Sequence, residues 1–148
     1  VADQGIDGQY LSTEARKACC GVRKVEPLKR ALSGGALWIT GLRASQSDTR
    51  STLSLVAMDT GFGLPKANPL LDWTREAVAE AAVAAGVPVN PLHGRGMPSI
   101  GCAPCTRAIA PGEDERAGRW WWESDNRREC GLHVGPSGVL TRAPEVRS

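Results

Sequence analysis

The sequence lacks any apolar run approaching the roughly 20 residues that a membrane-spanning helix needs. Residues 1–5 carry neither the positive charge nor the apolar core of a secretory signal. A net charge of +2 is too small to indicate a nucleic acid or a membrane surface as the partner. No internal repeat is visible, and no histidine stands near the paired cysteines described next. Together these absences predict a cytoplasmic protein with no membrane or nucleic-acid partner.

Five cysteines are the most informative feature that is present: Cys19 beside Cys20, Cys102 and Cys105 two residues apart, and Cys130 alone. In a reducing cytosol, paired cysteines more often bind metal than form disulfides. Four thiolates suit an iron–sulfur cubane or a structural zinc. Neighbours on a helix point about 100° apart, so each could reach a different iron of a cubane. The spacing leaves both centres open, and also unligated cysteines that serve as small buried hydrophobes.

Cys130 is a candidate nucleophile. Arg127, Arg128 and His133 stand near it, and positive neighbours lower the pKa of a thiol and raise its thiolate fraction. Glu129 acts in the opposite direction, so the residues also fit an exposed cysteine without chemistry.

Arg116 and Arg119 are candidates for anion binding. Standing three apart, they would share one face of a helical turn and could clamp a phosphate or sulfate group. The other interpretation is a solvated face paired with the acidic residues 113–115.

The pattern of elements predicts an α/β fold. Ser12 and Thr13 predict the start of a helix that carries the first cysteine pair and breaks or kinks near Pro27. Residues 36–40 form a nearly continuous apolar run, which predicts a buried strand, and residues 52–58 predict a second strand.

The second half of the sequence contains one strongly predicted helix, over residues 75–85. Thr74 is a good N-cap for this helix, and Gly86 and Pro88 end it. Residues 87–107 are rich in glycine and proline and predict a structured loop that presents the second cysteine pair.

Taken together, these motifs closely resemble the carboxy-terminal part of assimilatory adenylyl-sulfate reductases, from about residue 5 to residue 133. The matching stretches are residues 18–28, 38–43, 46–50, 66–70, 98–107, 112–123 and 129–133. No counterpart of the family's amino-terminal half, with its glycine-rich pyrophosphate loop, is present.

The resemblance implies a domain related to the adenine-nucleotide α-hydrolase fold, with a [4Fe–4S] cluster on the four paired cysteines. It implies that Cys130 attacks the sulfur of adenylyl sulfate and that thioredoxin then releases sulfite from the resulting S-sulfocysteine. It also implies that four side chains contact the anionic substrate: Lys24, Arg50, Arg116 and Arg119.

The resemblance divides the chain into residues 1–122, the part of the reductase domain with the cluster site, residues 123–134, a catalytic tail, and residues 135–148, a disordered tail. One alternative is a reductase of 3′-phosphoadenylyl sulfate, or an enzyme that uses both substrates. Another is a structural zinc module that binds nucleic acid through its arginines. A homo-oligomer is compatible with all of these.

Overall fold

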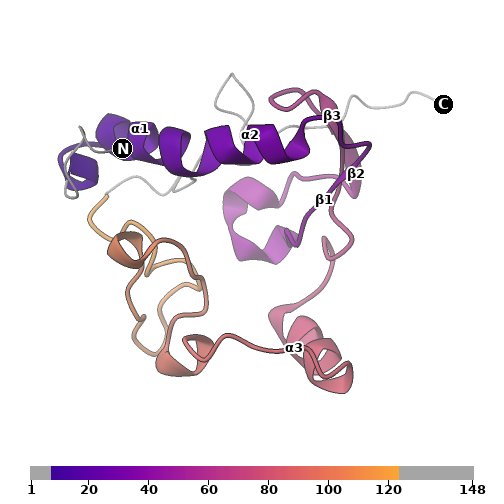
Figure 1. Ribbon diagram of the computed structural model, residues 1–148. Helices are drawn as coiled ribbons and strands as arrows, with labels where there is room; N and C mark the ends of the chain where they lie inside the picture. Colours follow the sequence, from indigo (N-terminus) through magenta and orange to yellow (C-terminus); the bar gives the residue numbers. More distant parts are fainter. Residues whose placement is uncertain (1–7, 124–148) are drawn as a thin grey trace.

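The computed structural model describes residues 8–123. Its longest feature is a continuous helical segment made of α1 (Thr13–Cys20), a π-helical turn (Gly21–Val25) and α2 (Glu26–Leu32) (Figure 1). Ser12 caps α1 as predicted, its side chain accepting a hydrogen bond from the backbone N–H of Ala15. The predicted break or kink near Pro27 takes the form of the π-helical turn, which interrupts the α-helical pattern between Cys20 and Glu26 while the chain stays helical. The π-helical turn lies directly before α2, and its wider path accommodates a proline, which cannot donate the usual backbone hydrogen bond.

A small mixed sheet lies near the α2 end of this segment (Figure 1). It consists of β1 (Trp38–Ile39), β2 (Val56–Asp59) and β3 (Leu64–Ala67) in the order β1-β3-β2, with β1 parallel and β2 antiparallel to the central β3. The α/β class predicted from the sequence is confirmed at this level.

One face of the sheet is apolar and exposed. Ile39, Ala67 and Val56 stand in register across the three strands, and Met58 lies beside Pro65 on the same face. Ile39 is 65% exposed, Val56 57% and Met58 51%. The prediction of a buried strand over residues 36–40 is therefore wrong, because β1 forms an edge with only two residues in the ladder.

The opposite face of the sheet buries a charged pair. The Lys66 ammonium lies 3.2 Å from an Asp59 carboxylate oxygen and 4.6 Å from the centre of the Trp38 ring. The other carboxylate oxygen of Asp59 accepts hydrogen bonds from the backbone of Gly61 and Phe62, in the turn that joins β2 to β3. The hairpin is thus held by one buried carboxylate with partners on both sides.

Helix α3 (Arg75–Ala84) begins at Thr74, whose side chain accepts a hydrogen bond from the N–H of Ala77. This confirms the predicted helix and its cap. The small core, Leu42, Leu53 and Leu71, lies elsewhere, and α3 contains no buried residue.

Five short 3-10 helices complete the described part of the chain: η1 (Gly8–Tyr10), η3 (Ala44–Gln46), η4 (Asp48–Arg50), η5 (His93–Arg95) and η6 (Ala103–Cys105). The last two lie within residues 87–107, which form a structured loop as predicted. None of the described helices is long and apolar enough to cross a membrane.

Candidate functional site

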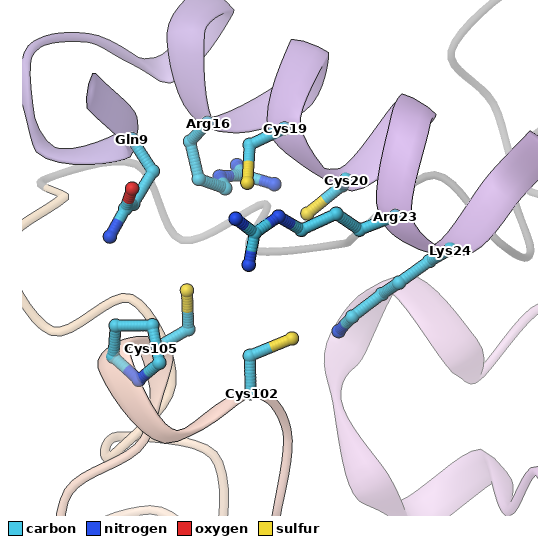
Figure 2. A pocket seen from close by; sticks show the side chains of 9 residues that line it. Gln9, Arg16, Cys19, Cys20, Arg23, Lys24, Cys102 and Cys105 are labelled. Carbon is cyan, nitrogen blue, oxygen red and sulfur yellow. The ribbon is translucent and has the colours of Figure 1, made fainter. Parts of the chain in front are cut away.

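The four paired cysteines line a single cavity of about 150 Å³. Cys19 of the first pair and Cys102 of the second stand 83 positions apart in the sequence. This cysteine cavity lies between the α1 end of the long helix and the loop that carries η6 (Figure 2). Cys20 and Cys105 are buried, Cys19 and Cys102 are partly exposed, and all four are free thiols. The structure therefore joins the two pairs that the sequence presents separately.

Local backbone bonds hold the second pair in place. The backbone N–H of Cys105 donates to the Cys102 carbonyl at 2.9 Å. The Thr106 hydroxyl donates to the same carbonyl at 3.0 Å and accepts from the Gly101 N–H at 2.9 Å. These bonds make a tight loop, from which the Cys105 sulfur points toward the helix and the Cys102 sulfur toward the end of the Lys24 side chain (Figure 2).

The cysteine cavity does not form a site for a single ion. Within residues 8–123, no three His, Cys, Asp or Glu side chains are close enough together to hold one metal ion. Zinc requires its sulfur ligands about 2.3 Å from one centre. A cubane takes its four thiolates on four different irons.

Cations surround the sulfurs. Arg16, Arg23 and Lys24 all line the cysteine cavity, and Figure 2 shows Lys24 extending toward the side on which Cys102 lies. Burial raises the pKa of the Cys105 thiol, and the charge of Cys102 adds to this, while Lys24 and Arg119 act in the opposite direction. Bound thiolates would gain from these cations.

Arg16 is locked in place by Glu123. Its guanidinium forms two hydrogen bonds to the carboxylate, at 2.7 and 2.8 Å, and only 1% of the Arg16 side chain is exposed. Burial disfavours the charged form of Arg16, but the hydrogen bonds and charge of Glu123 outweigh it and raise its pKa. The Trp120 ring lies 4.6 Å from Arg16 and 4.5 Å from Arg119, and Trp120 has a φ of 45°, which is rare for a bulky residue.

Arg119 lies directly beneath the loop of the second pair. Its guanidinium donates to the Ile100 carbonyl at 3.2 Å. A Cβ atom at Gly101 would stand only 2.3 Å from an Arg119 nitrogen, so a larger residue there would force the Arg119 guanidinium to move. Arg119 is 6% exposed and thus supports the cysteine loop from inside the protein.

A second network links the other two predicted arginines. Arg50 and the backbone N–H of Arg43 both donate to the side-chain oxygen of Gln46. The Arg43 guanidinium in turn holds Glu115, the residue before Arg116. The segments that carry Arg50 and Arg116 are thereby joined through side chains. Arg116 itself lies in a turn and not on a helix, contrary to the sequence interpretation.

The structure places two predicted site residues at the cysteine cavity, Lys24 in its lining and Arg119 under its loop, whereas Arg50 belongs to the Gln46 network. Cys130 and the predicted tail segments, apart from Glu123, lie outside the described residues. Sequence reasoning missed Gln9, Arg16 and Arg23, which also line the cavity. The four-residue spacing of Arg16 and Cys20 on a helix was the available signal.

The chain is similar to several known proteins. Residues 3–108 match the model of the phosphoadenosine phosphosulfate reductase domain. The chain is 62% identical over 134 residues to an adenosine 5′-phosphosulfate reductase of Sinorhizobium fredii, with 90% of the chain and 53% of that relative covered. It is 60% identical over 130 residues to the enzyme of that name from Rhizobium tropici, with 88% and 72% covered. For the one from Allochromatium vinosum, the identity is 59% over 133 residues, with 90% and 52% covered.

The fold and the site together define the class of this protein. It is a small α/β domain in which four thiols and several cationic side chains line one cavity. The chain belongs to the phosphoadenosine phosphosulfate reductase domain family. It spans about half the length of the Sinorhizobium and Allochromatium relatives.

Proposed function

We propose that the protein containing this chain reduces adenylyl sulfate to sulfite and AMP, in the cytoplasm, as a step in sulfate assimilation. The single observation that carries the proposal is the convergence of the four paired cysteines on one cavity in a chain with 50–62% identity to relatives named adenosine 5′-phosphosulfate reductase. The three-stranded sheet would be part of a larger domain of the adenine-nucleotide α-hydrolase type.

Two successive displacements at sulfur account for the reaction. The Cys130 thiolate attacks the sulfate sulfur, the bond from that sulfur to the phosphate oxygen breaks, and AMP leaves with the electron pair. The product is an S-sulfocysteine. A thiolate of thioredoxin then attacks the Cys130 sulfur and sulfite departs. The second thioredoxin thiol closes its disulfide and regenerates the Cys130 thiolate, so thioredoxin supplies the two electrons.

Cys19, Cys20, Cys102 and Cys105 would hold a [4Fe–4S] cluster. The observation that favours this group is that four free thiols line one cavity. When bound, the cluster would supply structural support and a local electrostatic field, not electrons for the reaction.

The cationic side chains would bind the substrate's charged groups. Arg50 and Arg116 lie on segments joined through Gln46, Arg43 and Glu115, which favours their acting on one anion. Lys24 lies at the cavity wall, where its ammonium could respond both to the sulfurs and to an anion nearby.

The test uses the complete protein that carries this sequence, purified without oxygen. Incubation with adenylyl sulfate in the absence of thioredoxin should add the mass of SO₃ to the peptide containing Cys130, and later addition of thioredoxin should release sulfite. Cys130→Ser should bind substrate and form no adduct. An adduct on one of the four paired cysteines instead would overturn the assignment of ligands and nucleophile.

Two alternatives have definite signatures in the same experiment. A reductase that prefers the 3′-phosphorylated substrate would form the adduct faster with that compound, and an enzyme for both would react with either at similar rates. A zinc module would contain zinc and form no adduct. It would also lack the broad absorption at roughly 400 nm that thiolate-bound iron clusters show.

A further inference from the structure

Gln9 presents a buried donor with nothing to donate to. The residue is 5% exposed, and its side-chain nitrogen Nε2 has no hydrogen-bond partner among the described residues. A buried amide N–H without a partner costs about 1–3 kcal/mol. Such a group in a folded protein calls for an acceptor that completes it.

The position of Gln9 identifies the kind of acceptor. Gln9 lines the same cavity as the four paired cysteines, and Figure 2 shows its amide at the edge of this opening, on the side where Cys105 lies. The next residue contacts the same loop, because the Tyr10 hydroxyl donates to the Pro104 carbonyl at 2.7 Å, one residue before Cys105. Gln9 therefore lies beside the loop that carries the second cysteine pair.

We propose that Gln9 donates an N–H···S hydrogen bond to the sulfur of Cys105, or to an adjacent sulfide, when the iron–sulfur group is bound. This inference rests on the proposed cluster. An anionic sulfur is the acceptor that the cavity offers, and hydrogen bonds to sulfur are among the factors that set the potential of such a cluster. A donor stabilises the more negative, reduced form, so Gln9 raises the reduction potential and slows the loss of iron.

Gln9→Met tests the inference, since methionine keeps the length of the side chain and removes the donor. In the complete protein, this variant should retain the iron and sulfide content of the wild type. The iron–sulfur stretching bands in resonance Raman spectra should lose part of their sensitivity to exchange from H₂O into D₂O. The potential should move to a more negative value, and iron should pass to a chelator about 10-fold faster.

Tyr10→Phe is the matched control, because it breaks the contact with Pro104 and leaves the Gln9 amide in place. This variant should keep the deuterium-sensitive bands. Equal loss of these bands in both variants would assign the effect to a loosened η1 and overturn the proposal. Unchanged bands, potential and iron release in Gln9→Met would overturn it as well, while leaving the cluster intact. Wild-type protein without iron and sulfide would refute the proposed cluster and this inference together.

Discussion

One guanidinium nitrogen of Arg43 lies 2.9 and 3.0 Å from the two carboxylate oxygens of Glu115, across 72 positions of the chain. The Arg43 side chain is 7% exposed and that of Glu115 20%. The pair connects the segment of Arg50 with the segment of Arg116. It thus gives two candidate substrate contacts a common support.

Glu115→Gln should weaken substrate binding without removing a substrate contact. The change removes the negative charge that faces the buried Arg43 guanidinium, and this loss costs about 1–3 kcal/mol in the free energy of unfolding. The KM for adenylyl sulfate should rise more than kcat falls, because the segment of Arg116 loses its position. The control is Glu113→Gln in the same loop, where the partner Arg107 is about one-third exposed and the change should have little effect on either constant. Equal effects of the two variants would contradict the positioning role.

Arg116→Ala should reduce the affinity for adenylyl sulfate. Loss of one hydrogen bond to a charged group costs roughly 1.5–3 kcal/mol of binding. Calorimetry on the complete protein measures this directly, with circular dichroism to establish that the fold is intact. Unchanged affinity would show that Arg116 belongs to a solvated surface and does not contact the substrate.

Glu123→Gln should destabilise the protein more than any exposed substitution. Only 1% of the Arg16 side chain is exposed. Removing one partner of a buried ion pair costs about 3–5 kcal/mol in the free energy of unfolding. Trp120, packed against Arg16, should report the change through its fluorescence. The measurement is urea denaturation followed at the tryptophan emission. A stability equal to the wild type would show that Arg16 finds another partner.

Cys102→Ser should lose iron. Each of the four ligands would hold one iron, and ligation energy is also folding energy, so the variant should contain less metal and unfold at a lower temperature. Iron and sulfide assays with a thermal melt measure both. Full iron and sulfide content in Cys102→Ser would exclude a cubane with this ligand set.

The ion pair of Arg107 and Glu113 should respond to acid at an unusually low pH. The Arg107 hydrogen bond lowers the pKa of Glu113 from 4.5 to about 2, assisted by the backbone N–H of Ala110. A lowered carboxyl pKa contributes stability that is complete above pH 4.5 and is lost as the pH falls through about 2. An NMR titration of the Glu113 carboxyl carbon gives the midpoint. A midpoint at the ordinary value would show that the pair does not persist in solution.

The sequence predicted correctly those features that depend on hydrogen bonds between residues close together in the chain, such as helix caps. Ser12 and Thr74 cap α1 and α3 as expected, since a cap needs only residues three positions apart. The convergence of the cysteines followed from the resemblance and not from spacing. Lys66 shows why β3 was missed: a lysine and a proline in a four-residue strand do not read as buried β-structure. The Asp59 carboxylate and the Trp38 ring, on the neighbouring strands, stabilise the buried Lys66 ammonium, and no local pattern in the sequence reveals these contacts.

The apolar face of the sheet has a practical consequence for protein production. Ile39, Val56 and Met58 form an exposed apolar surface on the sheet, and among the described residues β1 and β2 are its edge strands, so the surface is a template for contact between chains. The 148-residue chain expressed alone should therefore collect in insoluble material or as oligomers. Replacing Val56 and Met58 by threonine keeps a strand-forming residue at both positions and removes much of the adhesive surface, so it should increase the soluble yield.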